Sequence, residues 1–454
     1  MTRGVRALLG DPEKVVLKLS TPMIVAMLVQ SLYNIADGIW VSGLGADALA
    51  AIGLFFPVFM FIISIAVGIS IGGSATISRK IGARNKKLAD SAAVHTLIIG
   101  IGLGIILTLI LLLFIDNLFS LIGTKGRPVF LAMGYARILI AGTVILFSSN
   151  VASGILRGEG DTKRAMYAMV FGSLLNIVLD PIFIYRFKLG VVGAAWATLT
   201  SISASAVVFI FWLFIKRDTY VAIKFKGFRF NGGIIFEILR VGIPSSFAQF
   251  SMALAMFILN VIVVKVAGTN GIAVFTSAWR IIMLGIVPLL GIAIGVTAVT
   301  AAAYGAQDFD KLDRGYLYGI KFGFLVELGI VSAVLIFAPQ IARLFTYSRG
   351  AVHIFKELVT ALRWLVIFLL VTPFGLLTSS MFQGIGRGEN SLAVTILRTL
   401  IMQVFFSYLL GYYFNFGLRG VWWGIVIGNI VASVISFTWG RLTIHGLKLH
   451  SSGG

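Results

Sequence analysis

Positions 15–43 read VVLKLSTPMIVAMLVQSLYNIADGIWVSG and form the first apolar run of the chain. A helix needs about 20 mainly apolar residues to cross a bilayer, and this run exceeds that length. It follows Arg3, Arg6 and Lys14 and is too long for a cleavable signal peptide, so we interpret it as a membrane span. Similar runs recur along the sequence, which therefore predicts an all-α polytopic membrane protein.

The composition supports this class. Hydrophobic residues make up 59% of the 454 positions and charged residues 12%, with a mean hydropathy of +1.01. A soluble protein needs more charge to cover its surface, and the short alternating strands of a membrane barrel are absent. The net charge of +20 comes from basic residues in short loops, which indicates membrane topology and not nucleic-acid binding. The lack of cysteine excludes disulfides, iron–sulfur clusters and cysteine-based zinc sites.

Gly, Pro and charged residues divide the chain into twelve predicted spans. They lie at 15–43, 48–79, 90–118, 127–153, 163–186, 191–216, 234–266, 271–303, 313–343, 355–381, 391–414 and 420–446. Lysine and arginine gather in alternate loops, above all between Lys216 and Gly233, and both ends of the sequence are basic. The positive-inside rule therefore predicts a cell-membrane protein with both termini in the cytoplasm.

The two halves of the sequence repeat one another with a shift of about 222–227 positions. Pro22 corresponds to Pro244 and Gly158 to Gly384. We predict an N-lobe at 1–216, a cytoplasmic basic linker at 217–233, a C-lobe at 234–446 and a disordered tail at 447–454. Six spans per half make the repeats parallel, an arrangement typical of transporters that expose a central cleft to alternate sides. A rigid scaffold of two duplicated halves is the alternative.

Acidic residues inside apolar runs are the candidate functional groups, because a charge in the bilayer interior is costly. Asp37 shares one helix face with polar residues at i−7, i−4 and i−3. Asp180 lies one turn from an asparagine in the fifth span. With a rise of 1.5 Å per residue, a tyrosine of span four and a threonine of span six fall at similar depth in the outer half of the membrane. The predicted cation-coupling set is Asp37, Asp180, Asn176, Thr198 and Tyr135.

Two chemistries suit this set. Neighbouring carboxylates in a low dielectric share a proton, and hard oxygens also hold Na⁺. For Na⁺ the predicted ligands are Asp37, Asp180, Asn176 and Thr198. The alternative is that these groups only bond to one another and fix the helices.

The second half lacks these acids. Its repeat positions carry Leu259 and Phe406 in place of Asp37 and Asp180, and Met256 in place of Asn34. Methionine and aromatic side chains suit varied amphipathic guests, which makes Met256 a predicted substrate contact. Glu327 is interpreted as the structural ion-pair partner of Arg280 or Arg398, since all three lie in apolar runs.

Five segments resemble the multidrug and toxic compound extrusion (MATE) family, within it the DinF-like branch and members from hyperthermophilic archaea. They are PMIVAMLVQSLYNIADGIWVSGLG (22–45), RGEGDTKRAMYAMVFGSLLNIVLDPIFIY (157–185), GAAWATLTS (193–201), VFTSAWRIIMLGIVPL (274–289) and SSMFQGIGRGENSLAVTILRT (379–399). The resemblance implies a V-shaped fold of two six-helix bundles. It assigns cation coupling to the same five residues. It also implies substrate contacts at Met27, Gln30, Tyr33, Asn34, Asn150, Met169 and Ser173.

The function predicted from residues and resemblance is export of cationic or amphipathic compounds in exchange for inward H⁺ or Na⁺. A flippase for lipids or lipid-linked precursors is the first alternative, and an intramembrane enzyme is the second. We predict no catalytic residues, no cofactor beyond the coupling ion, no nucleic-acid partner and a monomer in the lipid bilayer.

Overall fold

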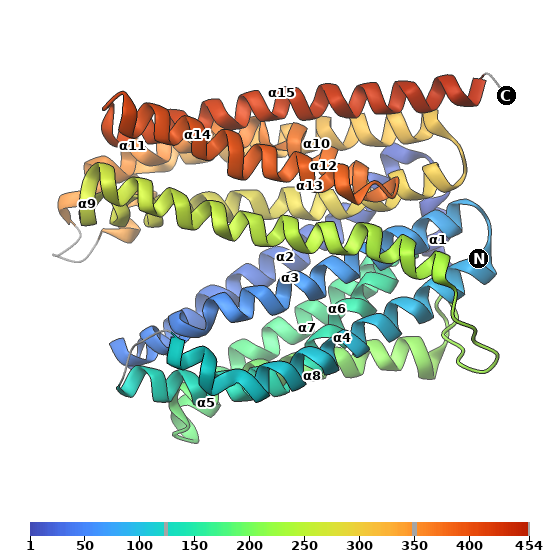
Figure 1. The fold of residues 1–454 in the computed structure, drawn as a ribbon, viewed down its shortest axis with the longest axis horizontal. Coiled ribbons are helices and arrows are strands. Elements are labelled where there is room, and N and C mark those ends of the chain that lie inside the picture. Colours follow the sequence, from blue (N-terminus) through green and yellow to red (C-terminus); the bar gives the residue numbers. More distant parts are fainter. Residues whose placement is uncertain (122–125, 347–351, 453–454) are drawn as a thin grey trace. The chain divides into compact units, whose positions relative to one another are not determined.

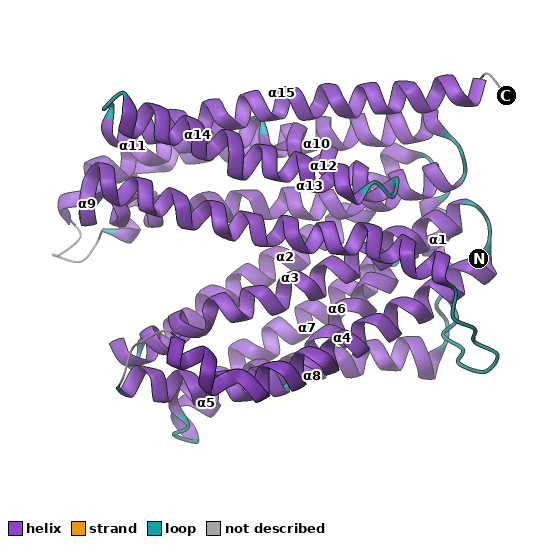
Figure 2. Ribbon diagram, in the orientation of Figure 1, coloured by secondary structure: helices purple, strands orange, loops and turns teal. Residues whose placement is uncertain are grey.

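The computed structural model describes residues 1–121, 126–346 and 352–452, and every regular element in these ranges is a helix (Figures 1 and 2). The first part of the chain forms α1 (Arg3–Leu8), α2 (Pro12–Ser42), α3 (Ala46–Gly82), α4 (Lys86–Leu121), α5 (Arg127–Ala141), α6 (Thr143–Gly158), α7 (Thr162–Pro181), η1 (Ile182–Arg186), α8 (Gly190–Ile210) and η2 (Phe211–Lys216). The second part forms α9 (Gly232–Gly305), α10 (Phe309–Phe345), η3 (Val352–Ile354), α11 (Phe355–Leu365), η4 (Val366–Leu370), α12 (Thr372–Gly384), α13 (Gly388–Ile396), η5 (Leu397–Met402), α14 (Gln403–Tyr408), η6 (Leu409–Tyr413) and α15 (Gly417–Ser452).

The predicted number of spans is confirmed. Within the described ranges, nine helices are long and apolar enough to cross a membrane. Two further spans each consist of two helical segments that meet at a bend. The bend is 48° between α5 and α6 and 43° between η4 and α12. The 74-residue α9 contains two spans, because Gly268 interrupts it with φ 61° and ψ −153°. Glycine adopts this conformation readily, so the chain reverses there without a long loop. Together these elements give twelve spans.

The spans pack into two compact units whose limits differ from the two halves of the sequence. One unit comprises residues 1–10 and 25–246, and the other comprises residues 11–24 and 247–454. The first helix of each half is therefore divided: α2 changes unit between Ile24 and Val25, and α9 does so between Ser246 and Phe247. We call the two units unit 1 and unit 2.

Unit 1 holds the start of α9 through close contact between small residues. A Cβ on Gly72 of α3 would lie 2.2 Å from the backbone oxygen of Ile238. A Cβ on Gly68, one turn earlier, would lie 2.5 Å from the oxygen of Gly242 and 2.0 Å from Oγ of Ser246. Glycines spaced by four residues bring helix backbones together in this way, which membrane helices use for tight packing.

Unit 2 repeats this arrangement with the start of α2. A Cβ on Gly295 of α9 would lie 3.1 Å from the oxygen of Val16 and 2.4 Å from Oγ of Ser20. A Cβ on Gly291 would lie 2.7 Å from the backbone nitrogen of Ile24. These two glycines follow those of unit 1 by 223 positions, and their partners precede the unit 1 partners by 222 positions. The sequence repeat is therefore also a repeat of helix packing.

Each unit has a hydrophobic core of its own. In unit 1 the core includes Phe55, Phe147 and Ile184, and the ring of Phe55 meets Tyr135 edge-on at 5.8 Å between centroids. In unit 2, Phe275 stacks on Trp422 at 5.6 Å. These apolar interiors fix the helices that carry the polar residues described below.

The predicted disordered tail is corrected in part, because α15 continues to Ser452. Nζ of Lys448 lies 2.8 Å from Oδ1 of Asp310 and 2.9 Å from Oδ2 of Asp313, both in the first turns of α10. These ion pairs fasten the end of α15 to unit 2. Residues 453–454 of the predicted tail lie outside the described ranges.

Candidate functional site

The predicted cation-coupling residues come together in unit 1. Asn176 and Asp180 lie one turn apart on α7, and both are buried. Thr198 of α8 and Tyr135 of α5 are buried beside them, while Asp37 of α2 is half-buried. Four helices of unit 1 thus contribute to one polar cluster, which we call the Asp37–Asp180 cluster.

Asn176 joins α7 to α8 within this cluster. With its amide oriented to satisfy both neighbours, Asn176 donates to Oδ2 of Asp180 at 3.0 Å and accepts from the backbone N–H of Thr198 at 3.2 Å. The amide of Asn176 thus acts as a donor and an acceptor at once. One oxygen of Asp180 is therefore held in place by a neutral group.

The two carboxyl groups face each other. Asp37 and Asp180 lie within hydrogen-bonding reach of one another. Oδ1 of each is buried, and no donor reaches either atom among the residues that the structure describes. Two carboxylates so close in a low dielectric cannot both be ionised cheaply unless a positive ion lies between them. The geometry therefore suits one H⁺ shared by the pair, or Na⁺ with neutral oxygens completing its shell.

Two tyrosines border the carboxyl pair. The hydroxyl of Tyr33, one turn before Asp37 on α2, lies close enough to interact with the Thr198 side chain and with both carboxyl groups. Tyr135 lies close enough to interact electrostatically with both carboxyl groups. The structure thus adds Tyr33, predicted as a substrate contact, to the residues around the candidate cation site.

The remaining predicted substrate contacts fall into three groups. Gln30 and Asn34 are exposed on α2, and Met27 is half-buried on the same helix. The contacts on α6 and α7, namely Asn150, Ser173 and Met169, belong to neighbouring helices of unit 1. Met256 belongs to unit 2, where it packs against the hydrophobic core.

Two residues of the α6–α7 group, Asn150 and Met169, already interact with other atoms of the protein. Nδ2 of Asn150 donates to the backbone oxygen of Leu146 at 3.0 Å, within the same helix. Sδ of Met169 lies 4.0 Å from Oγ of Ser153. The nitrogen of Asn150 therefore already has an acceptor, whereas its carboxamide oxygen accepts no bond within the described ranges.

The predicted ion pair of Glu327 with Arg280 or Arg398 is not formed in the described part of the chain. Glu327 is fully buried, and neither of its carboxyl oxygens has a partner there. Arg398 faces α12 instead, where its Cδ would lie 2.9 Å from a Cβ on Gly375. Arg280 is exposed whereas Glu327 is buried, and the expected pair with either arginine is therefore wrong.

The sequence does not predict the contact between Trp40 of α2 and Tyr185 of η1, which we call the clasp. The hydroxyl of Tyr185 donates to the backbone oxygen of Trp40 at 2.5 Å, and the two rings meet edge-on at 6.3 Å between centroids. The last carbonyls of a helix lack partners within it, so this hydroxyl satisfies one of them. Gly43 leaves the necessary room, since a Cβ there would lie 2.3 Å from the hydroxyl oxygen. The clasp joins the helices of Asp37 and Asp180 near their ends.

Tyr185→Phe and Gly43→Ala are each expected to lower the free energy of unfolding of the reconstituted protein by about 1 kcal/mol, the net value of one hydrogen bond. Chemical unfolding in bilayer discs measures the change. The double variant should lose little more than either single variant, because both remove the same bond. Gly53→Ala is the control, as its Cβ meets nothing within 4 Å. Fully additive losses would contradict the clasp.

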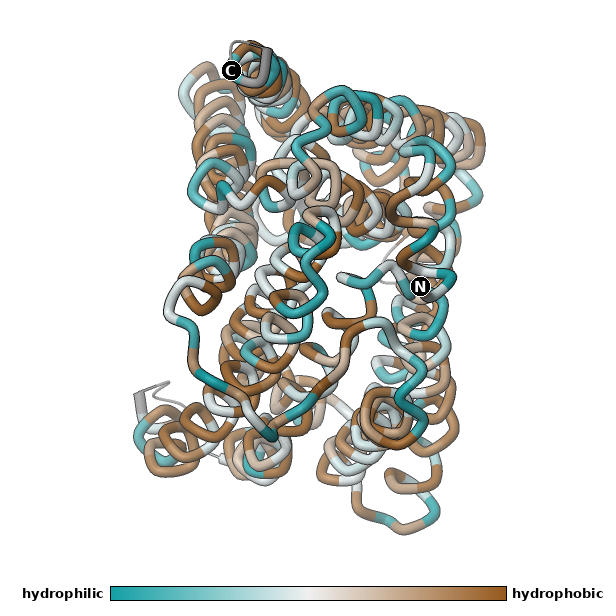
Figure 3. Tube along the Cα trace, turned by 90° about the vertical axis from the view of Figure 1, so that its right-hand side faces the viewer, coloured by the Kyte–Doolittle hydropathy of each residue, from teal (hydrophilic) through white to brown (hydrophobic). Residues whose placement is uncertain are grey.

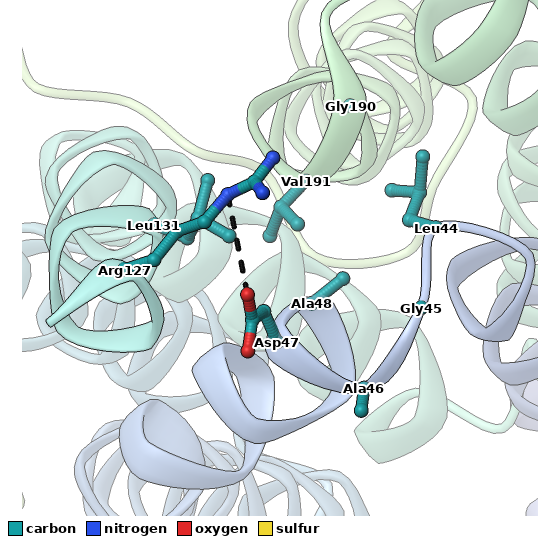
Figure 4. A pocket seen from close by; sticks show the side chains of 9 residues that line it. All are labelled: Leu44, Gly45, Ala46, Asp47, Ala48, Arg127, Leu131, Gly190 and Val191. Atoms are coloured by element: carbon teal, nitrogen blue, oxygen red, sulfur yellow. Dashed lines mark ion pairs between the residues drawn. The ribbon is translucent and has the colours of Figure 1, made fainter.

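A cavity of about 330 Å³ lies at one end of unit 1, where α2 ends and α3, α5 and α8 begin (Figure 4). Arg127 and Asp47 face each other across it at 4.0 Å, and both side chains are exposed. Exposed pairs of this kind contribute little to stability. None of the predicted site residues lines this cavity, so it is distinct from the Asp37–Asp180 cluster.

A buried carboxyl group, that of Glu159, lies directly after the last residue of α6. Oε2 of Glu159, in the turn between α6 and α7, accepts the backbone N–H of Val221 at 2.9 Å. Val221 belongs to the connection between η2 and α9. Burial raises the pKa of Glu159 to about 8, against an ordinary value of 4.5. The docked connection therefore retains a proton on Glu159 that the undocked, solvated form releases.

The sign of the pH dependence follows from this shift. Between pH 4.5 and pH 8 the docked form binds more protons than the undocked form, so docking weakens as the pH rises through this window. We expect hydrogen exchange at the Val221 amide, corrected for its intrinsic rate, to accelerate by at most about tenfold per pH unit. Glu159→Gln should remove the dependence, and Glu357→Gln, at an exposed position, should retain it. An exchange rate that falls with rising pH would contradict this interpretation.

Comparison with known proteins agrees with the architecture. A family model described as MatE matches residues 22–182 and 244–409. The multidrug export protein MepA of Staphylococcus aureus is 27% identical over 432 residues, covering 93% of this chain and 92% of the relative. An outward-facing multidrug resistance transporter of the MOP superfamily is 57% identical, with a TM-score of 0.97 and 99% of each chain covered. A MOP superfamily transporter from Pyrococcus furiosus is 56% identical, with a TM-score of 0.96 and 99% of each chain covered.

Proposed function

Because the chain belongs to the MatE family, we propose that it exports cationic or amphipathic organic compounds in exchange for an inward cation, H⁺ or Na⁺. Its similarity to multidrug export proteins over nearly the whole length supports the substrate class. In this proposal the protein is a monomer in the cell membrane with both termini in the cytoplasm, and it needs no cofactor besides the coupling ion.

The observation that carries the proposal is the Asp37–Asp180 pair, with its two buried and unsatisfied oxygens. A cation bound there neutralises the pair and lets the two helices stay together, whereas an empty pair is repelled apart. Asp37 lies on α2, the helix that begins in unit 2 and ends in unit 1. Occupancy of the site thereby acts on a helix that both units share, which is how ion binding would bias the direction in which the transporter opens.

The free energy of the inward cation limits the substrate gradient that such an exchanger can build. One inward charge supplies about 2.3 kcal/mol per 100 mV of membrane potential. A pH difference of one unit adds about 1.4 kcal/mol if the ion is H⁺. One cation per cycle therefore sustains roughly a hundredfold gradient of a neutral substrate.

Substrate contacts are proposed on the exposed face of α2, at Gln30 and Asn34, with Met27, Tyr33, Asn150, Ser173 and Met169 in unit 1 and Met256 in unit 2. Amide groups and thioethers combine polar and soft apolar contact, which suits guests with a cationic centre on an aromatic body. We expect Asn34→Leu to raise the KM for such a guest and to leave the cation dependence of transport unchanged.

Efflux of ethidium from proteoliposomes, driven by an imposed pH gradient or Na⁺ gradient in separate experiments, tests the proposal. Export in response to one gradient, and its loss when an ionophore dissipates that gradient, is the expected result. A protein that moves fluorescent lipid across the bilayer but no dye would instead be a flippase. Dye movement that needs neither gradient would refute coupled export.

A further inference from the structure

The connection between η2 and α9 contains a segment in which cations and phenylalanines alternate. Positions 224–230 read KFKGFRF, and Figure 3 shows hydrophilic and hydrophobic residues alternating along this connection. Lys224, Lys226 and Arg229 are exposed. Phe225 and Phe230 are also exposed, to 55% and 73%. Large apolar side chains that are exposed beside cations indicate a surface that has a partner. We call residues 224–230 the basic–aromatic loop.

The ends of this loop are fixed to unit 1 through its backbone. The N–H of Ala222 donates to Oδ1 of Asp90 at 2.8 Å, and the N–H of Asn231 donates to Nε2 of His95 at 2.9 Å. The ring of Phe228 packs on His95 at 4.7 Å between centroids. With Val221 bound to Glu159, four contacts hold the connection in one conformation. The loop is therefore presented as a formed surface.

The loop tip is a tight turn. The N–H of Phe228 donates to the oxygen of Phe225 at 3.2 Å, and Gly227 adopts φ 77°, which glycine tolerates without strain. The turn directs Phe225 and Phe228 to different neighbours. Phe228 packs inward on α4, which leaves the residues on either side of it exposed.

The position of Phe225 sets the depth of the loop in the membrane. Its ring stacks on Phe214 of η2 at 6.4 Å, with the ring planes 8° apart. The next residue of η2, Ile215, is 68% exposed, so this last turn of the span presents an apolar surface outward. Such a turn lies at the boundary between acyl chains and headgroups. Phe225 lies beside it, so the loop folds back along the end of this span.

The charge at this surface is not neutralised within the protein. Among the described residues, no ion pair involves Lys224, Lys226 or Arg229. The nearest acid in the connection, Asp218, is already engaged by Arg164 at 2.7 Å and by Lys216 at 3.3 Å. Three cations at the headgroup level attract anionic lipid, and each adds about 1 kcal/mol, or about fivefold in affinity.

We propose that the basic–aromatic loop binds anionic phospholipid, with its three cations on lipid phosphates and with Phe225 and Phe230 in the acyl boundary. The bilayer is the partner because the stack on Phe214 places the loop against the outer surface of a membrane span. The proposal does not depend on the export function or on the identity of the coupling ion.

The absence of cysteine from the chain allows a single reporter site. Gly232→Cys suits it, because a Cβ there meets nothing within 4 Å and the position is exposed. The bimane-labelled full-length protein in bilayer discs is titrated with a minor fraction of brominated phosphatidylglycerol or brominated phosphatidylcholine. We expect at least tenfold preferential quenching by phosphatidylglycerol at low salt, and loss of this preference at high salt.

Two variants separate headgroup recognition from mere proximity. Lys224→Gln/Lys226→Gln/Arg229→Gln should abolish the preference while retaining the backbone contacts that fix the loop. Arg127→Gln/Arg186→Gln/Lys188→Gln removes the same number of exposed cations from elsewhere in unit 1 and should retain it. Equal quenching by both lipids, absence of quenching by either, or quenching relieved by a soluble oligonucleotide would each overturn the proposal.

Discussion

Asp37→Asn is expected to abolish uphill export while the purified protein still folds and still binds substrate. Asparagine keeps the shape of the side chain but cannot carry the negative charge that a coupling cation neutralises. The substrate gradient that the ion gradient builds across proteoliposomes should therefore be lost. Dye accumulation measured at equal protein density gives this result directly.

The matched control for this variant is Asp47→Asn. Asp47 also lies in unit 1, but it is exposed, and its partner is Arg127 at 4.0 Å. The Asp47→Asn variant should retain export. Asp180→Asn should behave as Asp37→Asn does, because the two carboxyl groups act as one site. Uphill pumping by the Asp37→Asn/Asp180→Asn double variant would refute the coupling role of the cluster.

Gly72→Val is expected to destabilise the protein strongly by forcing two helices apart. The new side chain would begin 2.2 Å from the backbone oxygen of Ile238 and 2.9 Å from the backbone nitrogen of Gly242. Backbone atoms cannot rotate away as a side chain can, so α3 and the start of α9 must separate. We expect a loss of about 3 kcal/mol or more in the free energy of unfolding, at the upper end of what overpacking costs. Chemical unfolding of the reconstituted protein measures it.

Gly53→Val controls for the substitution itself, since it lies on the same helix and its Cβ meets nothing within 4 Å. The loss in the free energy of unfolding of Gly53→Val should not exceed the small effect of helix propensity. Gly295→Val, the repeat counterpart in unit 2, should resemble Gly72→Val, because its Cβ would lie 2.4 Å from Oγ of Ser20 and 3.1 Å from the oxygen of Val16. Equal stability of the variants at positions 72 and 53 would contradict the proposed helix contact.

Several features of the protein followed from the sequence because they depend on residues close together along the chain. The spans are visible as apolar runs, since a lipid environment requires each helix to satisfy its own backbone. The alignment of Pro22 with Pro244 revealed the repeat. Asp37 and Asp180 stood out because charges are rare in such runs, and their similar depth predicted the cluster that the structure contains.

Other features depend on contacts between distant residues, which leave no local pattern. The division of α2 and α9 between two units arises where Gly72 meets Ile238 and where Gly295 meets Val16. The bond from Tyr185 to Trp40 spans 145 positions of the chain. Glu327 appeared to have a partner because arginines also occur in apolar runs, yet the presence of two charges within the membrane spans does not fix whether their side chains meet. Hydropathy and spacing determined what must lie in the membrane, whereas packing decided which of those residues meet.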